Sequence, residues 1–569
     1  MPLLRSRAAL LVLLLLALWP LFRNLGGPLL WEDEGDTAVF ARRILATGLP
    51  TAWDGRIFSD SDYGFRVAPH ALGRDFVMVG TPWLPFYVTA GSFALLGESA
   101  WAARLPFALA ALATLALLHA FVLRATGCRR AAFAAALLLL ASTQFLRYAR
   151  ECRSYALNML FTMAVLYGFL RLGARRRDPW LAVAAVLLFH SQILPAAIAF
   201  AACAALALLH PRFRSRLPAF LRRVPWVVAF TVPWLLLGWS AVATNWTPLE
   251  RGVDLPARAM QLGVESTVAI PWLLWLVAGP RLWRSFREGD RDLLAIAACY
   301  VIAVFALLPL TLSQDILLAV GLRYVCGLLP VAAAVTGLVV ARASDGRPLR
   351  FAALLVLLAA TELAGNALPW LALGGGSGQL PIPGHPFVSV PGETSAKLFN
   401  ATWWRFVRGL DAPNPGTVSS LVGFVDGAVG PDDVLVTNFS WDDLSFYTNR
   451  RQGFRIAPEA TAVRDAAKAA GLPAYLFGLD DARWLIWRQA ADPLPGMSFE
   501  RVRATLEASG ARLEPVARFR ESLWENRPEL HWHRFPGERY FAPRKRDAEG
   551  RLHPDAVAYR IVRAGDTAP

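Results

Sequence analysis

Residues 30–48, LWEDEGDTAVFARRILATG, decide the fold more than any other stretch of this sequence. Four acidic residues follow the first long hydrophobic segment directly, and an amphipathic run that stops at a glycine comes next. In residues 37–46, Phe40 and Ile44 are four positions apart with two arginines at their edge, which is typical of a helix lying at a membrane interface. We therefore expect an acidic helix start just outside a first membrane span.

The composition predicts a membrane protein with a soluble tail. The chain has 569 residues, 55% of them hydrophobic, and a mean hydropathy of +0.39. Long apolar stretches recur from residue 3 to residue 370 and then stop, as in a polytopic protein with one soluble end. The net charge of +15 would also fit a nucleic-acid-binding protein. The arginines argue against that class, because most lie in short clusters between hydrophobic stretches, where cytoplasmic loops carry them.

Eleven membrane spans are predicted from hydropathy. They lie near residues 7–23, 101–123, 131–146, 155–171, 180–190, 194–209, 224–241, 267–281, 292–312, 321–341 and 349–370. Alternate loops (124–130, 171–177, 212–223, 281–291 and 342–350) are all arginine-rich, which places them and the N-terminus in the cytoplasm and the C-terminal part outside. The first span lacks a small-x-small cleavage site and is interpreted as a retained anchor.

We expect three parts along the chain. Residues 1–370 form the transmembrane module, with a large first outer loop at 23–100 in which 82–96 lies on the outer face. Residues 371–430 hold a Gly- and Pro-rich linker (374–392) and an aromatic helix (394–409). Residues 431–569 alternate as a small extracytoplasmic α/β domain, with strands at 434–439, 484–487, 513–519 and 530–535 and helices at 461–470 and 499–509.

The acidic cluster contains candidates for a general base. Asp33 and Glu34 lie at the N-terminus of the expected interfacial helix, where the helix dipole keeps a carboxylate ionised. The predicted topology turns them outward, above the mouth of the bundle. The alternative is structural, because acidic residues at helix starts are common caps.

Arginines on the outer side are candidates for binding a phosphate. Arg147, Arg150 and Arg153 lie in one short outer loop, and Arg323 begins the tenth span, all against the positive-inside bias. The planar guanidinium binds two phosphate oxygens at once. These arginines would otherwise reach lipid headgroups or pair with acidic loop residues. We expect the cavity beside them to be lined by the following residues: Tyr148, Tyr155, His190, Gln192 and Tyr324.

Metal and disulfide chemistry have weak support in the sequence. The first outer loop holds oxygen and nitrogen donors for a divalent ion, but their spacing matches no metal motif. These donors are Asp60, Asp62, His70 and Asp75. The five cysteines are scattered in or near the spans without CxxC spacing, so neither a disulfide framework nor a cysteine metal site is indicated. A divalent metal is therefore left open without support, no metal ligands are assigned, and no cofactor is certain.

Four stretches together resemble the GT-C superfamily of glycosyltransferases that use polyprenyl-phosphate sugars. They are Asp33–Glu34 followed by FARRILATG, then TPWLPFYVTAGSFALLGESAWAARLP (81–106), RYARECRSYAL (147–157) and RYVCGLLP (323–330). The sequence is most similar to the protein O-mannosyltransferase-like branch, which includes the lipid A aminoarabinose transferases, over roughly residues 5–345.

The resemblance implies that Asp33 is the catalytic base, that Glu34 supports it or contacts substrate, and that the outward arginines bind the donor phosphate, with inversion at the anomeric carbon. One departure is clear: many relatives carry a basic residue just before the element that reads TPWLPF here, and this chain has Gly80 and Thr81 instead. The expected phosphate contact must then come from elsewhere, such as Arg74 or Arg150, or the donor differs.

We expect an inverting glycosyltransferase at the outer face of a bacterial inner membrane. It would move a sugar from a polyprenyl-phosphate donor to a lipid, glycan or protein hydroxyl, with no nucleic acid as partner. A transporter or flippase of a lipid-linked substrate is the first alternative, and it predicts ionisable residues near the middle of the spans. The second alternative is a non-catalytic homologue whose outer domain binds a partner.

Overall fold

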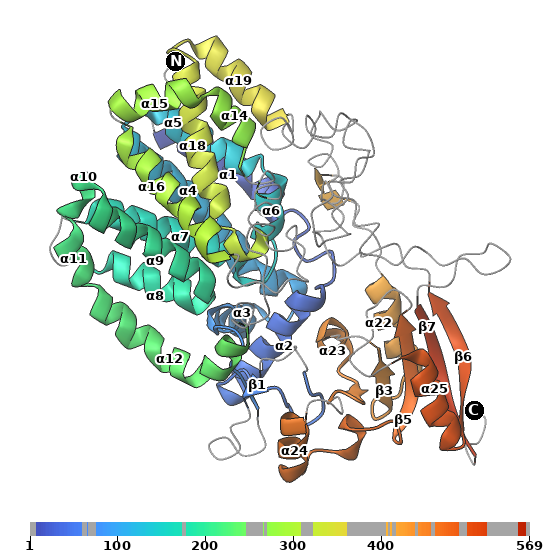
Figure 1. Ribbon diagram of the computed structural model, residues 1–569. Coiled ribbons are helices and arrows are strands. Elements are labelled where there is room, and N and C mark those ends of the chain that lie inside the picture. The colour runs from blue at the N-terminus through green and yellow to red at the C-terminus, as the bar shows by residue number, and fades with distance from the viewer. Residues whose placement is uncertain are drawn as a thin grey trace.

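The computed structural model describes residues 7–59, 65–66, 76–172, 178–245, 266, 270–288, 290–308, 322–360, 406–407, 410–411, 417–438, 442–456, 461–488, 498–519 and 556–564. Helices up to residue 360 form a bundle, and a smaller α/β part follows it in sequence and lies against one end of it (Figure 1). The helix α2 (Glu32–Thr47) lies between the bundle and the α/β part.

Apolar helices make up the bundle. They and the short connecting helices are α1 (Arg7–Phe22), α3 (Leu84–Leu96), α4 (Ala100–Thr126), α5 (Arg129–Leu140), α6 (Thr143–Ala149), α7 (Ser154–Arg171), α8 (Trp180–Ser191), α9 (Ile193–Leu209), α10 (Pro211–Arg214), α11 (Leu217–Leu221), α12 (Val224–Asn245), α14 (Trp272–Val277), α15 (Gly279–Glu288), α16 (Arg291–Leu307), η4 (Leu322–Val325), α18 (Leu328–Ala343) and α19 (Pro348–Ala360). A two-stranded sheet, β1 (Phe65–Arg66) and β2 (Val77–Met78), lies beside α12.

Only some of these helices are long enough by themselves to cross a bilayer. Within the described residues, Ala100–Thr126 and Leu217–Gly238 meet the length and hydropathy that a span needs, and α5 with α6 makes a third if the bent pair is one span. Six further apolar helices are shorter. The topology of eleven spans therefore stays a prediction.

Two predicted spans are broken in the structure. The stretch expected at 131–146 bends by 69° between α5 and α6. The Ser142 hydroxyl accepts the Phe145 N–H and so starts a new helix there. The stretch expected at 267–281 is divided into α14 and α15, and the second helix starts at Gly279 and Pro280, a favourable first-turn position for proline. Hydropathy depends only on apolar composition, so it does not predict these local helix starts.

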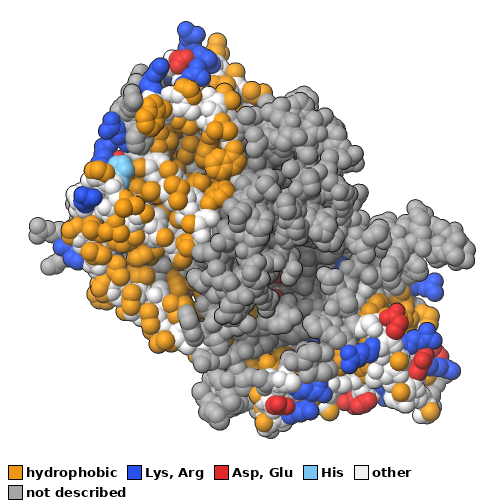
Figure 2. Space-filling model, viewed as in Figure 1, with side chains coloured by type: hydrophobic (Ala, Val, Ile, Leu, Met, Phe, Trp, Pro, Cys, Tyr) orange, Lys and Arg blue, Asp and Glu red, His pale blue; other side chains and the backbone are white. Residues whose placement is uncertain are grey.

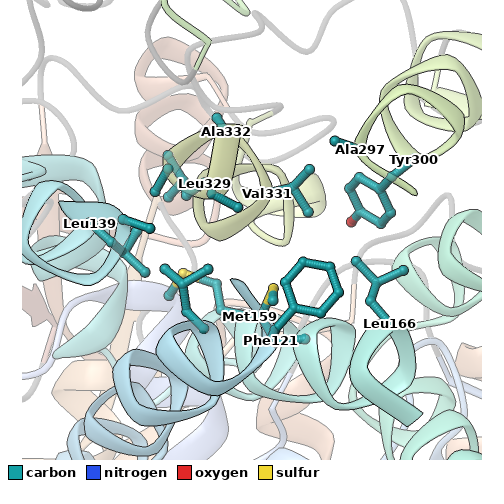
Figure 3. Close-up of a cluster of buried hydrophobic side chains, with 14 of the residues drawn as sticks. Phe121, Leu139, Met159, Leu166, Ala297, Tyr300, Leu329, Val331 and Ala332 are labelled. Atoms are coloured by element: carbon teal, nitrogen blue, oxygen red, sulfur yellow. The ribbon is translucent and has the colours of Figure 1, made fainter. Parts of the chain in front are cut away.

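The core of the bundle is apolar and closely packed. Phe121, Met159, Leu166 and Val331 come from three helices and meet in one cluster (Figure 3). The helices α5 and α18 approach closely because Gly337 has no side chain: a Cβ there would come within 2.5 Å of the Ala135 nitrogen. Alanine and glycine at the contact thus replace side-chain volume with close backbone packing, as is common between membrane helices.

The arginine-rich loops meet at one end of the bundle. Arg130 donates to the Gly346 carbonyl, and Arg223 donates to the Asp178 carbonyl. Arg342 makes a two-pronged contact with the buried Asp290, with both distances 2.8 Å. Loops that the charge pattern assigns to the cytoplasm are therefore neighbours in space.

The outer surface of the bundle is suited to lipid. Where Figure 2 shows described side chains of the helical part, most are hydrophobic, whereas charged side chains lie along its top and left edge and over the α/β part. Large apolar side chains such as Leu209, Trp226 and Leu236 are 76%, 63% and 69% exposed. An apolar surface of this kind is expected where acyl chains, rather than water, are the solvent.

The α/β part has a five-stranded sheet in the order β4-β3-β5-β7-β6. Its strands are β3 (Val434–Thr437), β4 (Arg451–Gln452), β5 (Ala482–Arg488), β6 (Ala511–Phe519) and β7 (Ala556–Arg563). The first three are parallel, and β7 runs antiparallel to both β5 and β6. The strands predicted at 434–439, 484–487 and 513–519 match β3, β5 and β6. The interior strand β7 was not predicted, and 530–535 lies outside the described residues.

Helices cover both faces of this sheet. Leu435 and Ile486 point to α22 (Thr417–Ala428) and α23 (Asp442–Thr448), whereas Val436 and Leu485 point to α25 (Phe499–Ala508). This follows from the two-residue period of a strand. The helices expected at 461–470 and 499–509 match α24 (Thr461–Ala469) and α25. The predicted linker at 374–392 lies outside the described residues, as does most of 394–409.

Candidate active site

The N-terminus of α2 carries the acidic pair. Trp31 precedes the helix in an extended conformation, and the Glu34 carboxylate accepts the Trp31 N–H at 3.3 Å. This is half of a capping box, and it fixes the first turn. Asp33 and Glu34 are consecutive residues of that turn, so their side chains leave the helix in different directions. As a result, the two carboxylates contact different residues.

Glu34 is fully buried and held by four hydrogen bonds. Arg104, from α4, donates Nε to Oε1 at 2.8 Å and Nη2 to Oε2 at 2.5 Å. The N–H groups of Cys152 and Trp31 donate to the same carboxylate at 2.9 and 3.3 Å. Since a buried carboxylate is tolerated only when it is paired and hydrogen-bonded, Arg104 and these N–H groups account for its presence here.

Arg104 also shapes the turn before α2. Its Nη1 donates to the carbonyls of Leu25 and Pro28 at 3.0 and 2.7 Å, and its Nη2 donates to the carbonyl of Leu29 at 3.0 Å. No role was predicted for Arg104, which lies near the start of the span predicted at 101–123. The available signal was an arginine near the start of an otherwise apolar segment, which is itself an indication of a functional or structural site.

Asp33 meets two arginines from distant parts of the chain. Its Oδ2 lies 3.0 Å from Nη1 of Arg323 and 3.7 Å from Nη2 of Arg153. Arg153 also donates Nη1 to the Asp33 carbonyl at 2.9 Å and to the Thr37 hydroxyl at 3.3 Å. These contacts bring α2, the N-terminus of α7 and the turn η4 together at one point.

Arg323 is positioned by a close backbone approach. It lies on η4, and its Nη2 donates to the Tyr324 hydroxyl at 3.0 Å. Just after this turn, a Cβ on Gly327 would come within 2.5 Å of the Tyr300 hydroxyl and 2.6 Å of the Thr162 hydroxyl. Glycine at this position therefore lets η4 reach the surfaces of α7 and α16.

The three charged side chains form a partly open, net positive site. Asp33, Arg153 and Arg323 are 21%, 24% and 18% exposed, which leaves each of them accessible to a ligand. Burial lowers the pKa of the Arg153 guanidinium, but the acidic groups around it, Asp33 first and then Tyr155 and Asp36, together outweigh burial and hold that pKa above its ordinary value. Two charged guanidinium groups beside one carboxylate, at the N-terminus of α7, can bind an anion such as a phosphate.

Some predicted residues lie close behind this site. Tyr155, near the start of α7, packs edge-on against Tyr148 with ring centroids 5.1 Å apart. Arg147 is buried, with its guanidinium 4.5 Å from the Tyr148 ring and 3.8 Å from the Glu151 carboxylate. Arg147 and Tyr148 are thus buried within the bundle, whereas Tyr324 contacts Arg323 directly.

Other predicted residues are held elsewhere. Arg150 donates Nη1 to the carbonyls of Pro20 and Leu21 at 2.9 and 3.1 Å and Nη2 to the carbonyl of Arg23 at 2.8 Å, at the C-terminal end of α1. The ring of His190 contacts the Phe230 carbonyl of α12 at 2.9 Å.

Gln192 accepts a hydrogen bond from Asn158 at 2.5 Å and lies beside Ser154, next to Arg153. Arg74 is outside the described residues. Within the described residues, no group of three His, Cys, Asp or Glu side chains is placed to hold a metal ion. The candidate ligands Asp60, Asp62, His70 and Asp75 lie outside those residues.

Known proteins are similar to this chain in part of its sequence and in its fold. The sequence model of the dolichyl-phosphate-mannose-protein mannosyltransferase family matches residues 80–239. The crystal structure of ArnT from Cupriavidus metallidurans bound to undecaprenyl phosphate is similar, with a TM-score of 0.57 and 17% identity over 90% of this chain and 97% of that one. The apo structure of the same protein gives the same TM-score and identity, over 89% of this chain and 96% of that one.

The resemblance to the GT-C superfamily is confirmed. The structural match extends across nearly the whole length of both chains, so it includes the α/β part that the family model does not reach. At 17% identity the match concerns the fold. No curated protein matches the sequence.

Proposed function

We propose that this chain is an inverting glycosyltransferase that takes a sugar from a polyprenyl-phosphate donor. The observation that carries the proposal is the contact of Asp33 with Arg153 and Arg323 in a partly exposed site at the start of α2. A carboxylate beside two guanidinium groups supplies a proton acceptor and an anion-binding pair within a few ångströms. Transfer of a sugar from a phosphate needs both functions.

In this proposal the Asp33 carboxylate takes the proton of an acceptor hydroxyl. The hydroxyl oxygen then forms a bond to the anomeric carbon of the sugar, and the bond from that carbon to the phosphate oxygen breaks. The electron pair of the broken bond stays with the phosphate, whose charge Arg153 and Arg323 stabilise. Attack on the side opposite the leaving phosphate inverts the anomeric carbon.

The donor phosphate would compete with Asp33 for the two guanidinium groups. In the structure, Nη1 of Arg323 donates a hydrogen bond to the Asp33 carboxylate. The donor phosphodiester carries one negative charge, as the carboxylate does, and gains a second when its bond to the sugar breaks, so the arginines are expected to move toward it during transfer and to leave Asp33 free to accept a proton. The undecaprenyl phosphate bound to the similar ArnT structure supports a polyprenyl phosphate as the carrier.

Glu34 has a positioning role in this proposal. Its carboxylate accepts four hydrogen bonds inside the protein, two of them from Arg104. It therefore keeps α2 and the turn that bears Cys152 and Arg153 in register, which sets Asp33 against Arg153. Arg150 likewise binds main-chain carbonyls at the end of α1, and we assign it to holding that helix.

The site would face outward from a bacterial inner membrane, with the N-terminus inside and the α/β part outside. The charge pattern of the loops supports this orientation, because the arginine-rich loops meet at the bundle end opposite the α/β part. The acceptor would be a lipid, glycan or protein hydroxyl that approaches from the outer surface.

Sugar transfer from labelled donors tests the proposal. The full chain in right-side-out membrane vesicles would be offered several polyprenyl-phosphate sugars, with vesicles lacking the chain as control. Transfer of the label to a lipid, glycan or protein fraction is expected, with inverted anomeric configuration in the product. Movement of an intact labelled donor across the bilayer without transfer would contradict the proposal and favour a flippase.

A further inference from the structure

A helix of the α/β part packs directly on the helix that carries Asp33. The helix α23 lies along α2 (Figure 1). Phe446 of α23 is 6% exposed and belongs to the apolar cluster that also contains Phe40 of α2 and Phe93 of α3. Its ring stacks on Phe93 with centroids 5.9 Å apart. The two parts of the molecule therefore share one core at this point.

Polar contacts fix the position of α23 along α2. The Leu30 N–H, just before the first turn of α2, donates to the Tyr447 hydroxyl at 2.9 Å. About three turns further along, Arg42 donates Nη2 to the Phe446 carbonyl at 3.0 Å, and its guanidinium lies 4.6 Å from the Phe446 ring. Arg42 also donates Nε to Glu98 at 2.6 Å. Two adjacent residues of α23 thus hold α2 at both ends.

The contact at Leu30 matters most for the site. Leu30 is buried and lies three positions before Asp33. The next N–H, that of Trp31, is accepted by Glu34. Without the Tyr447 hydroxyl, a buried N–H would be left without this partner, which is costly in a protein interior. The cheapest relief is a movement of the chain at residues 29–31, and that movement would shift Asp33 relative to Arg153 and Arg323.

We propose that α23 is a positioning element for the catalytic carboxylate, and that Tyr447 is the residue through which the α/β part fixes the start of α2. The inference rests on the proposed function only in taking Asp33 as catalytic. Tyr447 acts through the main chain of α2, so it changes the alignment of Asp33 rather than the binding of the donor phosphate.

The α/β part has other attachments to the first outer loop. Arg455 donates Nε to the Phe58 carbonyl at 3.2 Å, and the Tyr475 hydroxyl donates to the Arg56 carbonyl at 2.7 Å. A change confined to the Tyr447 hydroxyl is therefore expected to leave the α/β part docked. This separates the positioning role from the general attachment of the domain.

The test compares Tyr447→Phe with Tyr559→Phe in the full chain. Both remove one hydroxyl from the α/β part, but Tyr559 lies on β7 and packs against Phe499, away from α2. We expect Tyr447→Phe to lower kcat for sugar transfer about tenfold, equal to about 1.4 kcal/mol, with the donor KM changed less than about twofold. Tyr559→Phe should match the unmodified chain in both constants.

Hydrogen exchange gives a second readout that does not depend on activity. In Tyr447→Phe, amide exchange in a peptide covering residues 25–34 should rise about tenfold, because the Leu30 N–H loses its partner, whereas Tyr559→Phe should leave it unchanged. Unchanged exchange in Tyr447→Phe would overturn the inference, and so would unchanged kcat in a chain that transfers sugar. If the unmodified chain transfers no sugar from any donor, the proposed function fails, and exchange still decides whether Tyr447 holds α2.

Discussion

Asp33 and Arg323 are 290 residues apart in the chain, and their side chains meet at 3.0 Å. The contact joins the start of α2, which follows α1 in the sequence, to the turn that precedes α18. Arg153 reaches the same carboxylate from the N-terminus of α7. A site assembled from three distant segments is sensitive to the packing of each, and this sensitivity allows the roles of individual residues to be tested separately.

The two arginines Arg323 and Arg150 are expected to respond differently to the same substitution. Arg323→Gln removes the contact to the donor phosphate that we propose and should weaken donor affinity about tenfold to a hundredfold, with little change in stability. Arg150→Gln removes donors to the carbonyls at the end of α1 and should lower stability while leaving donor affinity unchanged. Donor binding and thermal unfolding in detergent would be measured for both. Equal loss of donor affinity in the two variants would mean that Arg150 also binds the donor phosphate.

Arg104 is expected to be essential for stability. Arg104→Met keeps much of the side-chain volume but leaves Glu34 buried without its cation. Breaking a buried pair in this way costs about 3–5 kcal/mol, so the unfolding temperature should fall sharply. The matched double variant Arg104→Met with Glu34→Gln removes the charge as well and should recover part of that loss. A double variant as unstable as the single one would show that the carbonyl contacts of Arg104, rather than its pairing with Glu34, dominate.

Gly327 and Gly91 form a matched pair for testing the position of η4. Alanine at Gly327 would collide with the hydroxyls of Tyr300 and Thr162, whereas nothing lies within 4 Å of a Cβ at Gly91. We expect Gly327→Ala to lower sugar transfer at least about tenfold by displacing Arg323, because small-to-large changes in a packed core force backbone shifts. Gly91→Ala should keep full activity. Wild-type transfer rates for Gly327→Ala would mean that η4 can move without disturbing the site.

Cysteine labelling tests the orientation of the bundle. Cys128 is partly exposed at the start of α5, on the side assigned to the cytoplasm, so a membrane-impermeant maleimide should label it in inverted vesicles and not in intact cells. Cys152 is an internal control: burial and the nearby Glu34 carboxylate raise the pKa of its thiol well above the ordinary value, which keeps it protonated and unreactive near pH 7. Labelling of Cys128 in intact cells would reverse the predicted topology.

The sequence alone predicts much of the bundle, for a physical reason. Each helix that crosses a bilayer must be apolar by itself, and the loops between such helices carry the charges, so both are visible in the local sequence. The helices α4, α7 and α9 accordingly begin and end near their predicted limits. Breaks such as Ser142 depend on a single side-chain cap and are not visible in hydropathy. The strand β7 was not predicted because Arg560 and Arg563 interrupt its apolar run, and its pairing with β5 and β6 is visible only in the fold.

The site was predictable only in part. Asp33 was selected because it belongs to an acidic cluster next to a predicted span. Arg323 was selected because an arginine on the predicted outer side is unusual. The same criterion also selected Arg150, which binds the end of α1, because sequence position does not say which acceptor a guanidinium finds. Arg104 and Tyr447 were missed because their roles depend on contacts with α2 from elements 70 and 417 residues away.

The proposed function requires Asp33 to be the base, and Asp33→Asn tests that role directly. Sugar transfer from a labelled polyprenyl-phosphate donor and binding of that donor would be measured for the variant and the unmodified chain at matched protein levels. If Asp33 is the base, transfer should fall by a factor of about 1,000 or more, while donor binding is kept or tightened, because the two arginines lose a competing carboxylate. Transfer at the wild-type rate, or loss of transfer only because donor binding collapses, would contradict that role.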